Sequence, residues 1–186
     1  MQQVSDKETE IILELAGSAP SDGDFVEMGC YRGDTSLLLA RLGRPLWLYD
    51  SFEGLPEKTL EDTSVAGDNF KAGELLVSKA EVVLRFKKAG LKVPRIKKAF
   101  FEDLTASDLP EKIAFAFLDG DLYQSIKTSL KLVAPKMVSG GIIVVHDYNN
   151  PELPGSYKAV DEFVKQNSAR LSGTISVRET LAILTF

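Results

Sequence analysis

The 186-residue sequence has one cysteine, Cys30, which excludes an internal disulfide. Long hydrophobic runs are also lacking: the longest, such as Ile142 to Val145, have the length of a strand and are too short to cross a bilayer. The first residues contain neither the basic segment nor the apolar segment of a secretory leader. These absences predict a soluble, cytoplasmic protein without a membrane partner.

Basic residues are too few to suggest a nucleic-acid-binding surface. Lysine and arginine number 22 against 27 aspartates and glutamates, so the net charge is −5 at pH 7. Binding to a phosphate backbone would need a basic stripe, and the sequence shows none. Hydrophobic residues make up 44% of the chain and charged residues 26%, an ordinary globular balance. We therefore predict one domain over residues 1–186 that binds small molecules.

The chain does contain an alternation of helix-like and strand-like segments, which is typical of a mostly parallel sheet. Hydrophobic periodicity and end signals predict helices at about 6–17, 35–42, 74–88, 123–133 and 156–167. Short apolar segments predict strands at about 25–28, 46–49, 93–99, 113–118, 142–145, 174–177 and 182–186. Asp34 is the expected cap of the second helix. Residues 51–72 are expected to form a long polar loop.

Acidic residues come at the carboxyl ends of four of these strands. They are Glu27, Asp50, Asp119 and Asp147. Because the carboxyl ends of parallel strands meet at one edge of a sheet, and ligands bind there, we expect these acids to face a ligand. The alternative is that each acid caps the helix that follows its strand.

A glycine turn follows the first strand, over residues 27–33 (Glu-Met-Gly-Cys-Tyr-Arg-Gly). The NAD fingerprint Gly-x-Gly-x-x-Gly fails because position 31 is tyrosine, and the lysine of a nucleotide-triphosphate loop is absent. The remaining pattern, acid-x-Gly-x-x-x-Gly, fits either a loop whose N–H groups approach a cofactor or a tight turn without a ligand. Asp50 can accept ribose hydroxyls of any adenosine cofactor. Cys30 is expected to fill space beneath the cofactor.

The segment that begins at Asp50 is more specific. Residues 50–56, Asp-Ser-Phe-Glu-Gly-Leu-Pro, resemble a signature of the macrocin O-methyltransferase family. Four further segments resemble that family in the same order: 26–33, 101–104, 118–125 and 140–148. The resemblance covers roughly residues 24–166. It implies an S-adenosylmethionine-dependent O-methyltransferase acting on a sugar or another natural-product hydroxyl.

The same resemblance implies a fold and a set of binding residues. The fold is an α/β, Rossmann-like class I methyltransferase, with a seven-stranded, mostly parallel sheet, helices on both faces and an antiparallel C-terminal strand. The methionine end of the cofactor would lie on Glu27, Gly29 and Tyr31, the ribose on Asp50 and Ser51, and the adenine on Phe101 and Glu102. The remaining cofactor-binding candidates are Gly33, Ser36 and Asp119.

Methyl transfer to a hydroxyl is an in-line displacement in which the hydroxyl must also lose its proton. The catalytic candidates are Asp119, Asp121 and His146. A divalent cation, Mg²⁺ or Mn²⁺, could lower the hydroxyl pKa if Asp119, His146 and Asp147 hold it. In the family an acid pair stands where this chain has His146-Asp147, which favours Mn²⁺ over Mg²⁺. The alternatives are a helix-capping turn at 119–121 and a hydrogen-bonded His146 without a chemical role.

Two other functions stay open at the level of the sequence. An NAD-dependent oxidoreductase would also use Asp50, although its glycine fingerprint is missing. A cofactor-binding module without catalytic activity is the second alternative, because the segment before the first strand is shorter than the family's. The sequence does not identify the acceptor, and it leaves the oligomeric state open, with a homodimer as one option.

Overall fold

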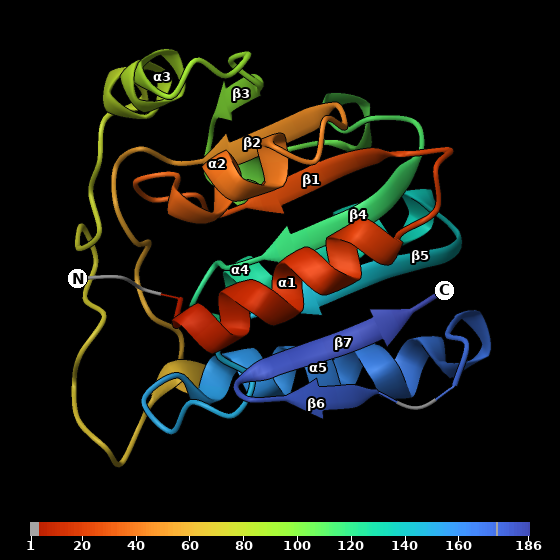
Figure 1. Ribbon diagram of the computed structural model, residues 1–186. Helices are drawn as coiled ribbons and strands as arrows, with labels where there is room; N and C mark the ends of the chain where they lie inside the picture. The colour runs from red at the N-terminus through yellow and green to blue at the C-terminus, as the bar shows by residue number, and fades with distance from the viewer. Residues whose placement is uncertain (1–3, 174) are drawn as a thin grey trace.

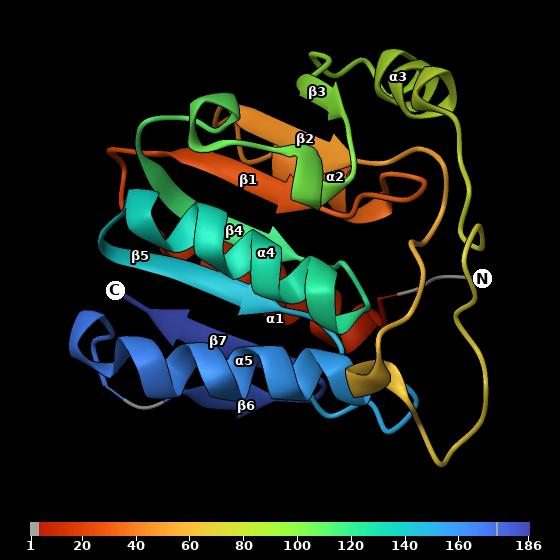
Figure 2. The ribbon, with the colours of Figure 1, turned by 180° about the vertical axis from the view of Figure 1, so that it is seen from behind.

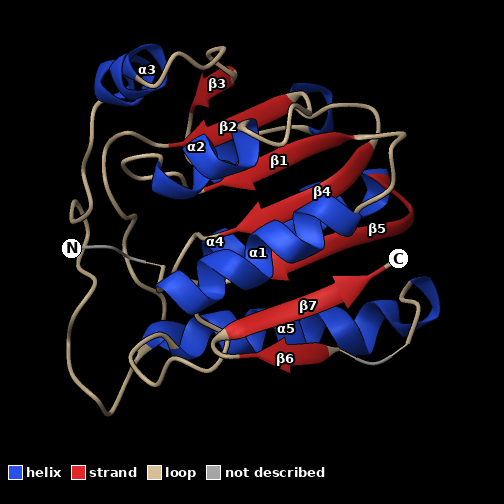
Figure 3. Cartoon of the chain, in the orientation of Figure 1, coloured by secondary structure: helices blue, strands red, loops and turns tan. Residues whose placement is uncertain are grey.

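The computed structural model describes residues 4–173 and 175–186. Its five α-helices among those residues are α1 (Asp6–Ser18), α2 (Asp34–Ala40), α3 (Lys79–Lys88), α4 (Tyr123–Val133) and α5 (Pro154–Asn167). The strands are β1 (Asp24–Met28), β2 (Leu46–Asp50), β3 (Arg95–Lys98), β4 (Ile113–Leu118), β5 (Met137–Val145), β6 (Ser176–Arg178) and β7 (Leu181–Thr185). Helices and strands alternate as expected until the chain ends in the β6–β7 hairpin (Figure 3).

The strands form one sheet in the order β3-β2-β1-β4-β5-β7-β6. The first five strands run parallel, and β7 pairs antiparallel with both β5 and β6. This confirms the predicted mostly parallel, seven-stranded sheet with antiparallel C-terminal strands. The chain reverses its direction of winding between β1 and β4, which places a crevice at the carboxyl ends of those two strands.

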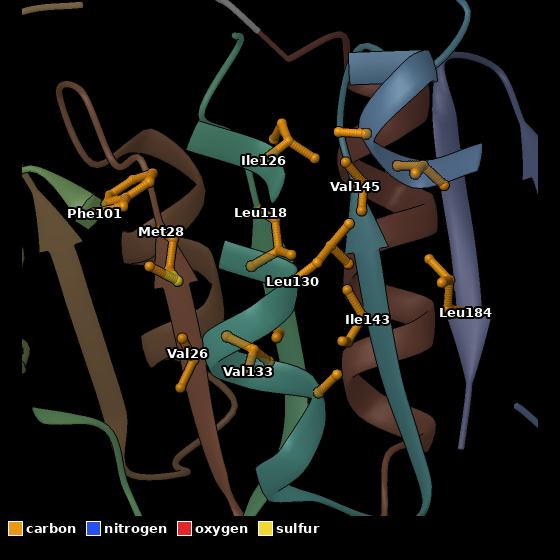
Figure 4. Packing of buried hydrophobic residues seen from close by; sticks show 14 of the residues in the cluster. Val26, Met28, Phe101, Leu118, Ile126, Leu130, Val133, Ile143, Val145 and Leu184 are labelled. Atoms are coloured by element: carbon orange, nitrogen blue, oxygen red, sulfur yellow. The ribbon is translucent and has the colours of Figure 1, made fainter. Parts of the chain in front are cut away.

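Helices cover both faces of the sheet, as predicted. Helices α1 and α2 lie on one face (Figure 1), and α4 and α5 lie on the other (Figure 2). Because both faces are covered, the central strand β4 is buried at every position from Ile113 to Leu118. Figure 4 shows the core on the α4 side, where Leu130 and Val133 of the helix lie beside Leu118 and Ile143 of the sheet.

The structure corrects two of the expected helix starts. Helix α3 begins at Lys79 rather than near residue 74, and the side chain of Ser78 caps it by accepting a bond from the Glu81 N–H. Leu75 lies before the helix with a φ of 61°, a left-handed conformation that ends the turn preceding α3. Asp34 is the first residue of α2 and does not cap it, because the N-cap position is taken by Gly33.

The long connection over residues 51–78 runs past the carboxyl edge of the sheet. It leaves β2, reaches the start of α5 and returns to α3, as the yellow trace in Figure 1 shows. Asp62 lies in the one short 3₁₀ turn of this segment, Leu60–Asp62, and is 1% exposed. A loop was predicted over 51–72, and the structure adds that part of it is packed against α5.

No helix in the described part of the chain is both long and apolar enough to cross a membrane.

Candidate functional site

The four acids predicted to share an edge do so. Glu27 lies near the end of β1, Asp50 ends β2, and Asp119 and Asp147 follow β4 and β5. Neighbouring parallel pairings bring these ends together, since β1 pairs with both β2 and β4, and β4 pairs with β5. The starting turn of α1 lies at the same edge (Figure 1).

The turn after β1 is held by very close backbone contacts. Gly29 has a φ of +89°, and a Cβ placed on it would lie 1.9 Å from the backbone oxygen of Asp119. Only glycine fits this position, because any side chain would meet backbone that cannot move aside. The next two N–H groups, of Cys30 and Tyr31, donate to Asp50 Oδ2 at 2.9 and 3.1 Å.

Asp50 therefore organises the loop as well as facing the cavity. Its Oδ1 accepts a further bond from the Phe52 N–H at 2.7 Å. A carboxylate offers about four acceptor positions, so three are used within the protein and about one is left for a ligand. Cys30 is buried as expected, with a thiol whose pKa is raised by burial, which fits a space-filling role.

Glu27 is the buried acid of the β1 turn. It is 1% exposed, and burial raises the pKa of its carboxyl to about 8, with the charges of Asp119 and Asp50 adding to the effect. Among the residues that the structure describes, neither Glu27 Oε2 nor Ser36 Oγ has a hydrogen-bond partner. Buried polar atoms are rarely left unpaired, so the pair marks a place for a polar or cationic group. A small cavity bounded by Glu27, Gly29 and Tyr31 adjoins it.

A second cavity lies beside the first and shares Gly29, Tyr31 and Asp119 with it. Among the predicted cofactor residues, it is also lined by Asp50, Ser51 and Phe101. Further lining residues that the sequence did not indicate include Leu55, Leu75, Phe100 and Ser125. The structure does not bring every candidate to it: Glu102 is exposed and lies outside the lining, and Gly33 serves as the N-cap of α2.

The other end of this cavity holds His146, Asp119 and Asp147. His146 Nδ1 lies 2.9 Å from Asp119 Oδ1 and 3.0 Å from Asp147 Oδ2. Their ligand atoms all lie within 4.8 Å of one another, as the predicted metal site requires. Two carboxylates and an imidazole fit a divalent transition ion better than Mg²⁺, which prefers oxygen ligands only. Asn150 fixes the other oxygen of Asp147 by donating to Oδ1 at 2.8 Å.

The acid-rich surroundings change how these groups ionise. Burial alone would lower the pKa of His146, but Asp119, Asp147 and Glu8 outweigh it and raise the pKa, which favours the imidazolium form of the ring. Burial raises the pKa of Asp121, and the nearby charges of Asp119 and Asp147 raise it further. Asp121 is therefore the acid of this cluster that holds a proton most readily.

The capping alternative for residues 119–121 fails for a reason that the sequence did not show. The first N–H of α4, on Tyr123, donates to Asp62 Oδ1 at 2.7 Å. Asp62 Oδ2 accepts from the N–H and the hydroxyl of Thr59, both at 2.9 Å. The distant loop thus caps α4, and Asp119 and Asp121 are left to line the cavity.

Comparison with known sequences shows the family of the chain. The sequence model of the macrocin-O-methyltransferase (TylF) family matches residues 7–175, most of the chain. The chain belongs to the macrocin O-methyltransferase family. This confirms the resemblance seen in residues 50–56 and extends it to helix α1 at one end and to the approach to β6 at the other.

Two curated relatives of this chain are O-methyltransferases by their names. The chain is 30% identical over 146 residues to the 8-demethyl-8-(2,3-dimethoxy-alpha-L-rhamnosyl)-tetracenomycin-C 4'-O-methyltransferase of Streptomyces olivaceus, covering 72% of this chain and 55% of that protein. It is 31% identical over 155 residues to the demethyldecarbamoylnovobiocin O-methyltransferase of Streptomyces niveus, covering 76% and 58%. The chain thus spans less than two thirds of the length of these relatives.

Solved structures of O-methyltransferases share the fold. The O-methyltransferase NovP matches with a TM-score of 0.80 at 26% identity, over 96% of this chain and 79% of that one. The calicheamicin methyltransferase CalS11 matches with a TM-score of 0.76 at 18% identity, over 96% and 77%. The seven-stranded sheet described above is therefore the Rossmann-like fold of the class I O-methyltransferases.

Proposed function

We propose that this chain is one S-adenosylmethionine-dependent domain, an O-methyltransferase that acts on a hydroxyl of a sugar or natural product. The observation that carries the proposal is the pair of adjoining cavities that share Asp119. One is lined by Glu27, whose Oε2 has no hydrogen-bond partner among the described residues, and the other leads from Asp50 to His146 and Asp147. Named relatives that methylate natural products support this function over an oxidoreductase or a module without catalytic activity.

The residues fit the cofactor by their chemistry. The unpaired Oε2 of Glu27 and the hydroxyl of Ser36 would receive the amino group at the methionine end, beside Gly29 and Tyr31. Asp50 would accept a ribose hydroxyl with its remaining acceptor position, next to Ser51. Phe101, together with Phe100, would contact the adenine ring.

The acceptor hydroxyl would bind at the Asp119 end. S-adenosylmethionine would supply the methyl group there, with its sulfur leaving as the thioether, and the acceptor hydroxyl would give its proton to a nearby base. Asp119, Asp121 and His146 are the side chains placed to take that proton or to orient the hydroxyl. The raised pKa of His146 favours a ring that donates hydrogen bonds when no ion is bound, and we propose that an aspartate then takes the proton.

A divalent cation is part of this proposal, held by Asp119, His146 Nδ1 and Asp147. Such an ion would lower the pKa of the acceptor hydroxyl, and the imidazole nitrogen favours Mn²⁺ over Mg²⁺. The −5 net charge supports a small-molecule acceptor rather than a nucleic acid. We also propose that the protein works in the cytoplasm.

The test is methyl transfer from S-adenosylmethionine to a panel of glycosides, free sugars and catechols, with Mn²⁺, Mg²⁺ or EDTA present. We expect product with at least one sugar hydroxyl, more with Mn²⁺ than with Mg²⁺, and a large loss in EDTA. Full activity in EDTA would remove the metal from the proposal. Turnover confined to catechols would contradict the sugar as acceptor.

A further inference from the structure

Glu8, in the first turn of α1, is a charged side chain buried at the reaction edge. It is 5% exposed, although glutamate at this helical position normally faces solvent. Its Oε2 accepts from the Ser5 N–H at 3.0 Å and the Ser5 hydroxyl at 2.6 Å, which forms a capping box. Its Oε1 accepts from the Thr180 hydroxyl at 2.5 Å. The capping box accounts for the hydrogen bonds of one carboxylate oxygen, but it does not explain why the Glu8 side chain is buried.

The reason for the burial lies on the other side of Glu8. His146 Nε2 is 3.7 Å from Glu8 Oε2, while Nδ1 of the same ring faces Asp119 and Asp147. The imidazole is thus held between one carboxylate from the N-terminal helix and two from the sheet edge. The edge of Phe117 lies against the ring, with a distance of 6.1 Å between the ring centroids.

In many metal sites that use histidine, a carboxylate stands beside the second ring nitrogen; here Glu8 Oε2 lies 3.7 Å from Nε2, an ion-pair contact that is longer than a hydrogen bond. In such sites the carboxylate accepts the N–H that faces away from the ion, and it thereby sets both the tautomer and the orientation of the ring. Here Nε2 faces Glu8, and Nδ1 is the atom available to the site.

We propose that Glu8 is the positioning residue of the reaction edge: its charge attracts the Nε2–H of His146 and keeps that side of the ring turned toward α1, so that Nδ1 is presented to Asp119, Asp147 and a divalent cation. The inference rests on the proposed function and extends it to α1. Thr180 and Ser5 aim the Glu8 carboxylate at the ring, and together they link both ends of the chain to the site.

The experiment uses the fact that His146 is the only histidine in the sequence. In protein with ¹⁵N-labelled histidine, the two imidazole nitrogens give unambiguous NMR signals. With Zn²⁺, a diamagnetic probe, the wild-type ring should bind through Nδ1 and keep its proton on Nε2. The variant Glu8→Gln keeps a capping-box partner but loses the charge, so in the Zn²⁺-bound protein the ring should bind the ion through either nitrogen instead of through Nδ1 alone.

The second measurement is the affinity for Zn²⁺ alone, determined by calorimetry. Glu8→Gln should weaken binding by about 10- to 100-fold, the usual effect of losing such a partner. Glu14→Gln is the matched control, because Glu14 lies on the same helix in an exposed ion pair with Arg178. It should leave both the NMR signals and the Zn²⁺ affinity unchanged. If Glu8→Gln fails to fold, Thr180→Val removes the hydroxyl that aims Glu8 and should shift the Nε2 signal in the same direction.

The outcomes separate this inference from the proposed function. Wild-type imidazole signals and Zn²⁺ affinity in a folded Glu8→Gln variant would overturn the role of Glu8. A wild-type protein that binds no divalent cation would instead contradict the metal site. In that case the Nε2 signal is compared between the wild-type protein and Glu8→Gln without any ion. An unchanged signal would rule out the contact between Glu8 and His146.

Discussion

On the β1–β2 side of the edge, glycine and backbone N–H groups set the shape of the site, whereas on the β4–β5 side charged side chains do. Gly29 approaches Asp119 backbone so closely that no side chain fits, and two N–H groups bond to Asp50. Across the cavity, His146 is held by ion pairs with Asp119, Asp147 and Glu8. We therefore expect substitutions that add side-chain volume to be most damaging on the β1–β2 side, and substitutions that remove charge to be most damaging on the β4–β5 side.

The largest expected effect tests the backbone side of this comparison. Gly29→Ala should lower the free energy of unfolding by more than about 4 kcal/mol, because the new Cβ collides with Asp119 backbone in addition to the left-handed strain. Gly43→Ala is the matched control: its φ is +74°, and an added Cβ meets no described atom within 4 Å. That variant should lose about 1–2 kcal/mol. Equal losses in urea denaturation would show that the close approach is unimportant.

Asp50 is the acid that holds the loop on the backbone side, through bonds from the Cys30, Tyr31 and Phe52 N–H groups. Asp50→Asn should weaken S-adenosylhomocysteine binding by about 2–3 kcal/mol, since it loses a charge-assisted bond and disturbs the loop that it anchors. Calorimetry measures the affinity. Asp24→Asn is the control, because Asp24 accepts from Trp47 Nε1 at the opposite end of β1. Unchanged affinity in Asp50→Asn would refute the ribose assignment.

The loop over residues 51–78 is tied to the start of α4 by the buried Asp62, and removing that side chain should destabilise the loop. Asp62→Ala leaves the Tyr123 N–H unpaired and should lower the free energy of unfolding by about 1–3 kcal/mol. Hydrogen exchange should rise across the loop more than in the sheet. Asp68→Ala, which removes only exposed ion pairs, should change stability by less than about 0.5 kcal/mol. Comparable exchange in both variants would contradict the role given to Asp62.

Per pH unit, the smallest effect is a pH dependence from Glu27. The folded protein raises its pKa to about 8, so between about pH 5 and 8 the folded state holds a proton that the unfolded state has lost. Stability from this group should therefore fall as pH rises, by at most about 1.4 kcal/mol per pH unit. Urea denaturation of wild type and Glu27→Gln across this window measures it. A slope that persists in Glu27→Gln would assign the dependence to another group.

Much of the fold follows from local patterns in the sequence. The order of the strands could not be derived from periodicity. The resemblance to the family correctly implied a seven-stranded, mostly parallel sheet with an antiparallel C-terminal strand. Helix α3 was predicted to start too early because Leu75 continues the apolar pattern, while its backbone is left-handed at 61°. The cap of α2 was misplaced for a related reason: Gly33 adopts a left-handed conformation that no side-chain pattern reveals.

The part of the candidate site that could be predicted is the part where residue type and position at the end of a strand are enough to indicate a ligand. Asp119, His146 and Asp147 follow buried strands, and the structure brings their ligand atoms together. Glu8 and Asp62 were missed because each acts on a segment far away in the sequence. Ser5 and Glu8 form a visible capping-box pattern, but nothing local to it indicates that the carboxylate faces His146.

We propose that this edge binds S-adenosylmethionine, with the ribose on Asp50 and the amino group of the methionine end on Glu27. The most direct measurement is calorimetric titration of the wild-type protein with S-adenosylhomocysteine and, separately, with NADH. We predict one-to-one binding of S-adenosylhomocysteine in the micromolar range, strengthening from pH 6 to 8 as Glu27 loses its proton, and no binding of NADH. Binding of NADH, or no heat with S-adenosylhomocysteine at either pH, would contradict the account.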